Sequence, residues 1–216
     1  MMRISRPNPW LLLLLAGQLL LLLHASRHDS VTVDEFALLP AGLAKLQHGT
    51  DVFWLNPVNP PLVPMLQAAP LYLGGERIDR AAIGPERPEA RWEAGLSFMR
   101  ERPDRYRGLF AGARAVTMAF ALLTTLLLYA LMRTIVPGRR VALGAAALAA
   151  FGPNLIGHGH LATVDSAFTC FTLAVVVCIA RLTQRAHPTQ GPARAASDRR
   201  AGFAMTALLT LSLAGA

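Results

Sequence analysis

Acidic residues are scarce over much of this 216-residue chain. Outside residues 26–108 there are only two, Asp165 and Asp198, whereas arginine occurs on both sides of that segment. The net charge of +8 is concentrated in short basic connections at 133–140 and 181–200. A basic protein can bind nucleic acid, but short basic loops between apolar blocks are typical of the cytoplasmic side of membrane proteins. The charge pattern therefore predicts a membrane topology and no nucleic-acid partner.

Cysteine is also scarce. Cys170 and Cys178, the two in the chain, lie in the same apolar block. They are too few for a metal site, and eight residues apart on a helix they are too distant to form a disulfide. We interpret both as small apolar residues.

The apolar residues, 53% of the chain, do not alternate with polar ones as they would in the strands of a membrane barrel. They form continuous blocks, and a helix needs about 20 such residues to cross the hydrocarbon core. The second block reaches this length alone, and the others nearly reach it with their uncharged flanks. We predict an all-α, polytopic transmembrane protein with about five spans. These spans lie at about 10–25, 109–132, 141–157, 163–182 and 202–216.

The basic connections also predict the orientation of these spans. With Arg3 and Arg6 in the cytoplasm, the spans alternate so that both basic connections are cytoplasmic. The loop 26–108 and the 158–165 turn then face the exterior. The first block also fits a cleaved signal peptide, and cleavage would leave residue 27 on the same side. Because the chain stops inside its fifth apolar block, we expect a fragment of a longer protein.

The exterior loop 26–108 contains two predicted helices. The first covers 33–48 and lies along the membrane surface, although Pro40 would strain it. Its apolar face contains Phe36, Leu39, Leu43 and Leu46. The second follows "NPVNPPL", where Asn59 suits an N-cap and Pro60 the first helical position. The charged stretch 75–108 is predicted to be a solvated helical loop.

Two adjacent carboxylates, Asp34 and Glu35, stand at the start of the first predicted helix. Thr32 and Glu35 fit a capping box, in which Glu35 would only accept a backbone N–H. A carboxylate at a helix N-terminus is also favoured in its ionised form. At the exterior lipid surface, such a group could accept a proton from an acceptor hydroxyl. The residue types alone leave both interpretations open.

A second polar cluster, "HGHLATVDSAF", follows the third apolar block. An Asp within a membrane helix costs about 2.5–3.5 kcal/mol, so Asp165 is predicted to face protein, water or a ligand. His158, His160 and Asp165 have side chains that ligate zinc or manganese. Asp165 or Thr163 could instead simply cap the following helix. The cluster therefore leaves a divalent metal ion open as a cofactor, and we assign no residue as a metal ligand.

The order of these motifs resembles the membrane glycosyltransferases of the GT-C type, in particular glycosyltransferase family 39. That family includes protein O-mannosyltransferases and lipid A aminoarabinose transferases. The resemblance rests on "VDEFALLPAGLAKLQHG", "NPPL", "RGLFAGARAVTMAF" and "GHGHLATVDSAF". It covers the chain as the N-terminal part of such an enzyme, whose later half, with further spans and substrate-binding residues, is absent here. It implies sugar transfer from a polyprenyl-phosphate carrier to a protein, lipid or glycan acceptor outside a bacterial inner membrane, with a cytoplasmic N-terminus.

The resemblance also implies roles for particular residues. Asp34, with Glu35 beside it, is expected to be the general base, and one carboxylate can suffice because phosphate is a good leaving group. Arg114 either pairs with the carrier phosphate or snorkels to the interface. The residues expected to bind substrate are Asp165, His160, Arg114 and Asn59. The alternative is a transporter-like or structural membrane protein in which the acids are helix caps.

Overall fold

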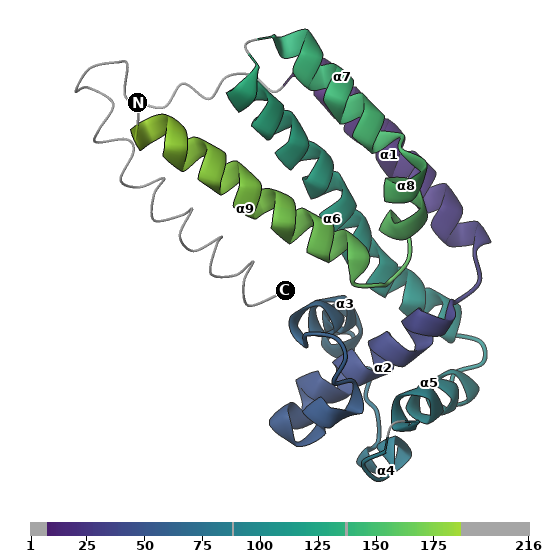
Figure 1. Ribbon diagram of the computed structural model, residues 1–216. Coiled ribbons are helices and arrows are strands. Elements are labelled where there is room, and N and C mark those ends of the chain that lie inside the picture. The colour runs from purple at the N-terminus through teal and green to yellow at the C-terminus, as the bar shows by residue number, and fades with distance from the viewer. Residues whose placement is uncertain (1–7, 88, 137, 187–216) are drawn as a thin grey trace.

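The computed structural model describes residues 8–87, 89–136 and 138–186, and every regular element in these ranges is a helix. The predicted all-α, membrane-type fold is therefore confirmed for this part of the chain. The helices form two groups, a bundle of long apolar helices and a smaller cluster at one end of it (Figure 1). The fifth predicted span, 202–216, lies outside the described residues.

The bundle consists of α1 (Pro9–His28), α6 (Tyr106–Ile135), α9 (Asp165–Ala186) and the pair α7 (Arg139–Ala150) and α8 (Pro153–Gly159). The helices α1, α6 and α9 are each long and apolar enough to cross a membrane. The pair α7 and α8 bends by 53° at a short break and could form one further span. Large apolar side chains remain exposed on the bundle, where lipid would cover them, including Leu13, Leu20, Leu148 and Ile179.

Helix α6 is the centre of the bundle and packs against α1, α7 and α9. A polar contact joins it to α1: the Thr125 hydroxyl donates to Gln18 Oε1 at 2.9 Å, and the Gln18 side chain is fully buried. Such bonds between membrane helices fix their register, because lipid offers no alternative partner. At 1.5 Å per residue α6 is about 45 Å long, which exceeds the ~30 Å hydrocarbon core. It therefore extends beyond the membrane.

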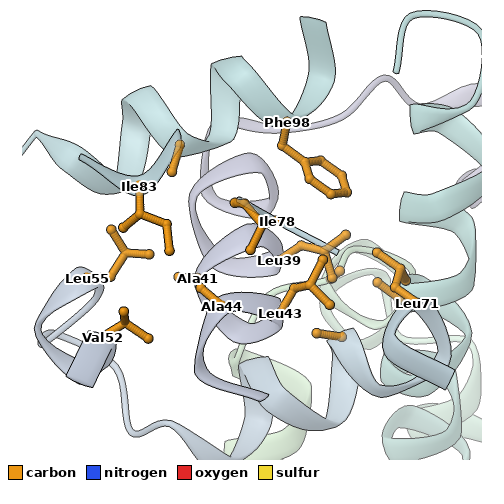
Figure 2. Packing of buried hydrophobic residues seen from close by; sticks show 14 of the residues in the cluster. Leu39, Ala41, Leu43, Ala44, Val52, Leu55, Leu71, Ile78, Ile83 and Phe98 are labelled. Carbon is orange, nitrogen blue, oxygen red and sulfur yellow. The ribbon is translucent and has the colours of Figure 1, made fainter. Parts of the chain in front are cut away.

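The second group, residues 33–100, is called here the helical cap. It contains α2 (Val33–His48), the 3-10 helix η1 (Gly49–Leu55), α3 (Leu62–Leu73), α4 (Arg80–Ile83) and α5 (Ala90–Arg100). Helix α2 lies between α3 and α5. Its residues Leu39 and Leu43 are fully buried and form a core with Leu71 and Phe98 (Figure 2). Phe110 of α6 completes this core and joins the cap to the bundle.

Two glycines allow the close packing around α2. A Cβ added at Gly42 would lie 2.1 Å from the carbonyl oxygen of Pro64 in α3, and one at Gly95 would lie 2.2 Å from that of Phe36. The Phe36 carbonyl is the one that Pro40 cannot bond within α2, because proline lacks an N–H. The carbonyl that Pro40 leaves without a helical donor is thus the one that Gly95 of α5 approaches.

The cap confirms one sequence prediction and corrects three. Helix α2 has the predicted bounds 33–48, but its apolar face packs against protein rather than lying along the membrane surface. The predicted N-cap at Asn59 is wrong: α3 begins at Leu62, and Pro61 occupies the N-cap position. The stretch 75–108 is not merely a solvated loop, because α5 buries Phe98 against α2.

Candidate functional site

A polar pocket of about 300 Å³ lies where the cap meets the bundle. It is built from the first turn of α2, the loop before α3, the start of α5 and the start of α9. Its polar lining residues are Asp34, Asn56, Asn59, Arg91, Trp92, Thr163 and Asp165. The structure therefore brings together three of the sequence-predicted site residues, Asp34, Asn59 and Asp165, from segments far apart in the chain.

The two carboxylates of this pocket each lie in the first turn of a helix, where the helix dipole favours an anion. Asp34 is exposed and makes no hydrogen bond or ion pair with other described residues. Asp165 accepts a hydrogen bond from the Thr163 hydroxyl at 2.9 Å, and His158 Nδ1 lies 3.6 Å from the same oxygen. Asp34 is thus available to a ligand, while Asp165 is already oriented.

Beneath the loop before α3 lies a buried lysine. The ammonium group of Lys45 donates to the carbonyl oxygen of Asn56 at 3.1 Å, and the residue is 2% exposed. Burial lowers the pKa of Lys45, because desolvation disfavours the charged form. The side chain of Asn56 in turn contacts Asn59, whose amide nitrogen lies 3.5 Å from Asn56 Oδ1. Lys45 therefore holds the pocket-lining loop in place.

Arg114 and Glu35 form a buried ion pair behind the pocket rather than in it. Arg114 Nε and Nη2 each donate to a Glu35 carboxylate oxygen at 2.7 Å. The remaining donors of Arg114 bind the carbonyl oxygens of Ser26, Asp29 and Ser30 at 2.8–3.1 Å. All five guanidinium N–H groups are thus used between the end of α1 and the start of α2. Phosphate binding by Arg114 stays a prediction, and it would require these bonds to break.

The carboxylate of Glu35 accepts three hydrogen bonds in addition to those from Arg114. It accepts from the backbone N–H of Thr32 at 2.9 Å and its hydroxyl at 3.1 Å, so the predicted capping box forms. It also accepts from the backbone N–H of Ala162 at 2.8 Å. Burial alone would raise the pKa of Glu35, but the hydrogen bonds from Arg114, Ala162 and Thr32 outweigh it, and the pKa is lowered.

These bonds fix the two acidic walls of the pocket relative to each other. Glu35 directly follows Asp34 in the chain, and its partner Ala162 directly precedes Thr163. A second contact supports the same turn: Gln67 of α3, fully buried, donates to the Thr163 carbonyl at 2.8 Å and to the Thr117 hydroxyl at 2.9 Å. Sequence reasoning missed Gln67, because its partners lie 50 and 96 residues away.

His160 lies outside the pocket. Its Nε2 is 2.6 Å from a carboxylate oxygen of Asp29, and its Nδ1 is 2.7 Å from the carbonyl oxygen of Ile156. The ring thus joins the end of α8 to the connection that follows α1. His158 lies beside Asp165 instead, so the two histidines have different partners. Within the described ranges, no group of three or more His, Cys, Asp or Glu side chains could hold a metal ion.

A second cavity of about 370 Å³ lies among α6, α7, α8 and α9. Its accessible walls are almost entirely apolar, with Ala149 and Leu155 among the lining residues. His158 and Asp165 also line it, and Asp165 is shared with the polar pocket. Asp165 therefore borders both an apolar space of the bundle and the polar pocket.

Comparison with known protein families gives a match over more than half of the chain. The family model described as dolichyl-phosphate-mannose-protein mannosyltransferase matches residues 96–216. This range includes Arg114, Thr163 and Asp165, whereas Asp34 and the loop before α3 precede it. No curated protein and no solved structure matches the chain significantly.

Proposed function

The chain belongs to the dolichyl-phosphate-mannose-protein mannosyltransferase family, and from that premise we propose that it transfers a sugar from a polyprenyl-phosphate carrier to an acceptor hydroxyl. Membership makes it a transferase of the glycosyltransferase type and an integral membrane protein. The family description names a lipid-phosphate-linked mannose and a protein acceptor, so mannose and a protein hydroxyl are the first substrates to test.

The observation that supports this proposal most strongly is the position of the polar pocket. It lies between the start of α2, which follows α1 in the chain, and the start of α9; α1 and α9 are each long and apolar enough to cross a membrane. A sugar carried on a lipid is confined to the membrane surface. The acceptor and the base must therefore reach its anomeric carbon at that surface. The apolar cavity that shares Asp165 offers space for part of the lipid chain.

In the proposed mechanism, the carboxylate of Asp34 accepts the proton of the acceptor hydroxyl as its oxygen attacks the anomeric carbon. The bond between that carbon and the phosphate oxygen breaks, and the phosphate leaves with the electron pair, with inversion at the carbon. Phosphate needs no protonation to leave, so the second carboxylate of glycoside hydrolysis is not required. Asp165, held by Thr163, orients the acceptor. Glu35 positions the base rather than acting as one.

Charge indicates the orientation of this site. The carbonyl of Thr134 in α6 accepts from the Gln184 amide of α9 at 2.7 Å, so the C-terminal ends of both helices lie together, away from the cap. The bundle residues near this end include Arg133, Arg139, Arg140 and Arg181. By the positive-inside rule this end is cytoplasmic, which places the cap and the pocket outside. We propose a bacterial inner-membrane protein with a cytoplasmic N-terminus.

The proposal is tested by comparing Asp34→Asn with Asp51→Asn, an exposed aspartate in the first turn of η1, in the membrane-embedded protein. Sugar transfer from the polyprenyl-phosphate donor to a protein acceptor is measured together with membrane insertion. Loss of a general base lowers the rate by about 10²–10⁴-fold. We expect that loss for Asp34→Asn, with insertion retained, and near-parental transfer for Asp51→Asn. Transfer by Asp34→Asn near the parental rate would exclude Asp34 as the base.

A further inference from the structure

Two hydrogen-bond donors in the wall of the polar pocket have no partner among the described residues. They are the amide nitrogen of Asn56 and the Nε of Arg91, and both atoms are buried. Asn56 as a whole is 2% exposed. A buried donor without a partner costs about 1–3 kcal/mol, and more when it is charged. Because both residues line a ligand-sized pocket, a ligand bound there could supply the missing acceptors.

Both donors are held in fixed positions. The backbone of Asn56 is fixed by Lys45 Nζ, and its side-chain oxygen faces Asn59, which leaves its NH₂ group turned from these contacts. The guanidinium of Arg91 lies over the ring of Trp92, 4.7 Å from its centroid. No ion pair joins Arg91 to an acid in the described part of the chain, whereas Arg87 of the cap, and Arg102 and Arg105 just after it, each have one.

We propose that Asn56 and Arg91 form the subsite that binds the phosphate group of the lipid-linked donor. This inference rests on the proposed function. A partly buried cation without a carboxylate partner favours an anionic ligand, and charge-assisted hydrogen bonds to phosphate are stronger than those to neutral groups. In the proposed reaction the donor phosphate is the anion, whereas the acceptor hydroxyl is neutral and suits the carboxylates.

The same two donors would also favour the reaction itself. The phosphate carries one negative charge as a diester and gains a second when the bond to the sugar breaks. Donors fixed beforehand at this position stabilise the developing charge without reorganisation. Asp34 lies in the same pocket as Asn56 and Arg91. The base that accepts the proton and the donors that bind the leaving phosphate are therefore different residues. The apolar cavity that shares Asp165 with this pocket offers space for part of the lipid that carries this phosphate.

The experiment measures binding of two lipids to the purified, lipid-embedded protein: polyprenyl phosphate and the matching polyprenol, which lacks the phosphate. We expect Arg91→Ala to raise the Kd for polyprenyl phosphate by about 10- to 100-fold, and to change the Kd for polyprenol by less than about twofold. Arg91→Lys retains the charge and should recover part of the loss. Arg100→Ala, an exposed arginine on the same helix, should leave both constants unchanged.

Asn56→Asp is the second variant, because it keeps the side-chain volume and replaces the donor by a negative charge. It should weaken binding of polyprenyl phosphate at least as much as Arg91→Ala, again without affecting polyprenol. The subsite is refuted if both lipids lose affinity equally, if neither does, or if only the KM for the acceptor rises. If the unaltered protein neither binds polyprenyl phosphate nor transfers sugar from it, the proposed function itself fails.

Discussion

The ion pair between Glu35 of the cap and Arg114 of the bundle can be tested by removing one of its two charges. Glu35→Gln keeps the shape of the side chain but replaces a carboxylate oxygen by an NH₂ group. In the structure one oxygen accepts from Arg114 Nε and Ala162 N, and the other accepts from Arg114 Nη2 and two Thr32 donors. In either orientation, therefore, the new NH₂ group faces at least two donors.

The size of the effect follows from the burial of this pair. Glu35 is 0% exposed and Arg114 is 3% exposed. Removing one partner of a buried pair costs about 3–5 kcal/mol, because the other charge is left uncompensated. For a chain of this size each kcal/mol lowers the Tm by about 2–4 °C. We expect Glu35→Gln to lower the Tm by roughly 6–20 °C.

Thermal unfolding of the detergent-solubilised protein is the assay, with Glu93→Gln as the matched control. Glu93 pairs with Arg87 on the cap surface, where both side chains are about half exposed. Exposed pairs contribute less than about 1 kcal/mol, so the control should shift the Tm by no more than a few degrees. Equal shifts for the two variants would refute the reasoning that this pair joins the cap to the bundle.

Three further predictions follow from the same contacts. The lowered pKa of Glu35 means that its contribution to stability is complete above its usual value of 4.5 and is lost as the pH falls through the lower folded value, so acid should destabilise the parent more than Glu35→Gln in unfolding scans. Gly95→Ala should cost about 1–3 kcal/mol by overpacking, whereas Gly108→Ala, with nothing within 4 Å, should be neutral or stabilising; a Tm measurement that ranks them the other way contradicts the close approach at Gly95. Gln67→Leu should lower kcat for sugar transfer at temperatures where the protein stays folded, and an unchanged kcat would show that the Thr163 turn does not need this contact.

Local signals predicted α2 correctly. Thr32 and Glu35 form a capping box at its start, and Gly49 follows its last residue at a positive φ of 65°. Both features depend on neighbours within a few residues, so the sequence displays them directly. The face of α2 could also be assigned, but not what covers it, because lipid and protein select the same apolar residues. Only the tertiary structure shows α3 and α5 there.

The candidate site was predictable in part. The resemblance to a family identified Asp34, Asn59 and Asp165, and the structure places all three in one pocket. It did not predict that Arg114 is committed to Glu35, 79 residues away, because no local pattern encodes a contact of that range. Arg91 was missed for a related reason: in a charged stretch it looks like any solvated arginine, and only its buried Nε distinguishes it.

The central claim is that a sugar carried by a polyprenyl phosphate reacts beside Asp34. It is tested most directly by a structure of the membrane-embedded protein with a non-reactive analogue of the donor bound. We expect the anomeric carbon to lie in the polar pocket, with the carboxylate of Asp34 on the face opposite the phosphate. A donor bound with its anomeric carbon in another cavity, or with Asp34 on the same side as the phosphate, would contradict it.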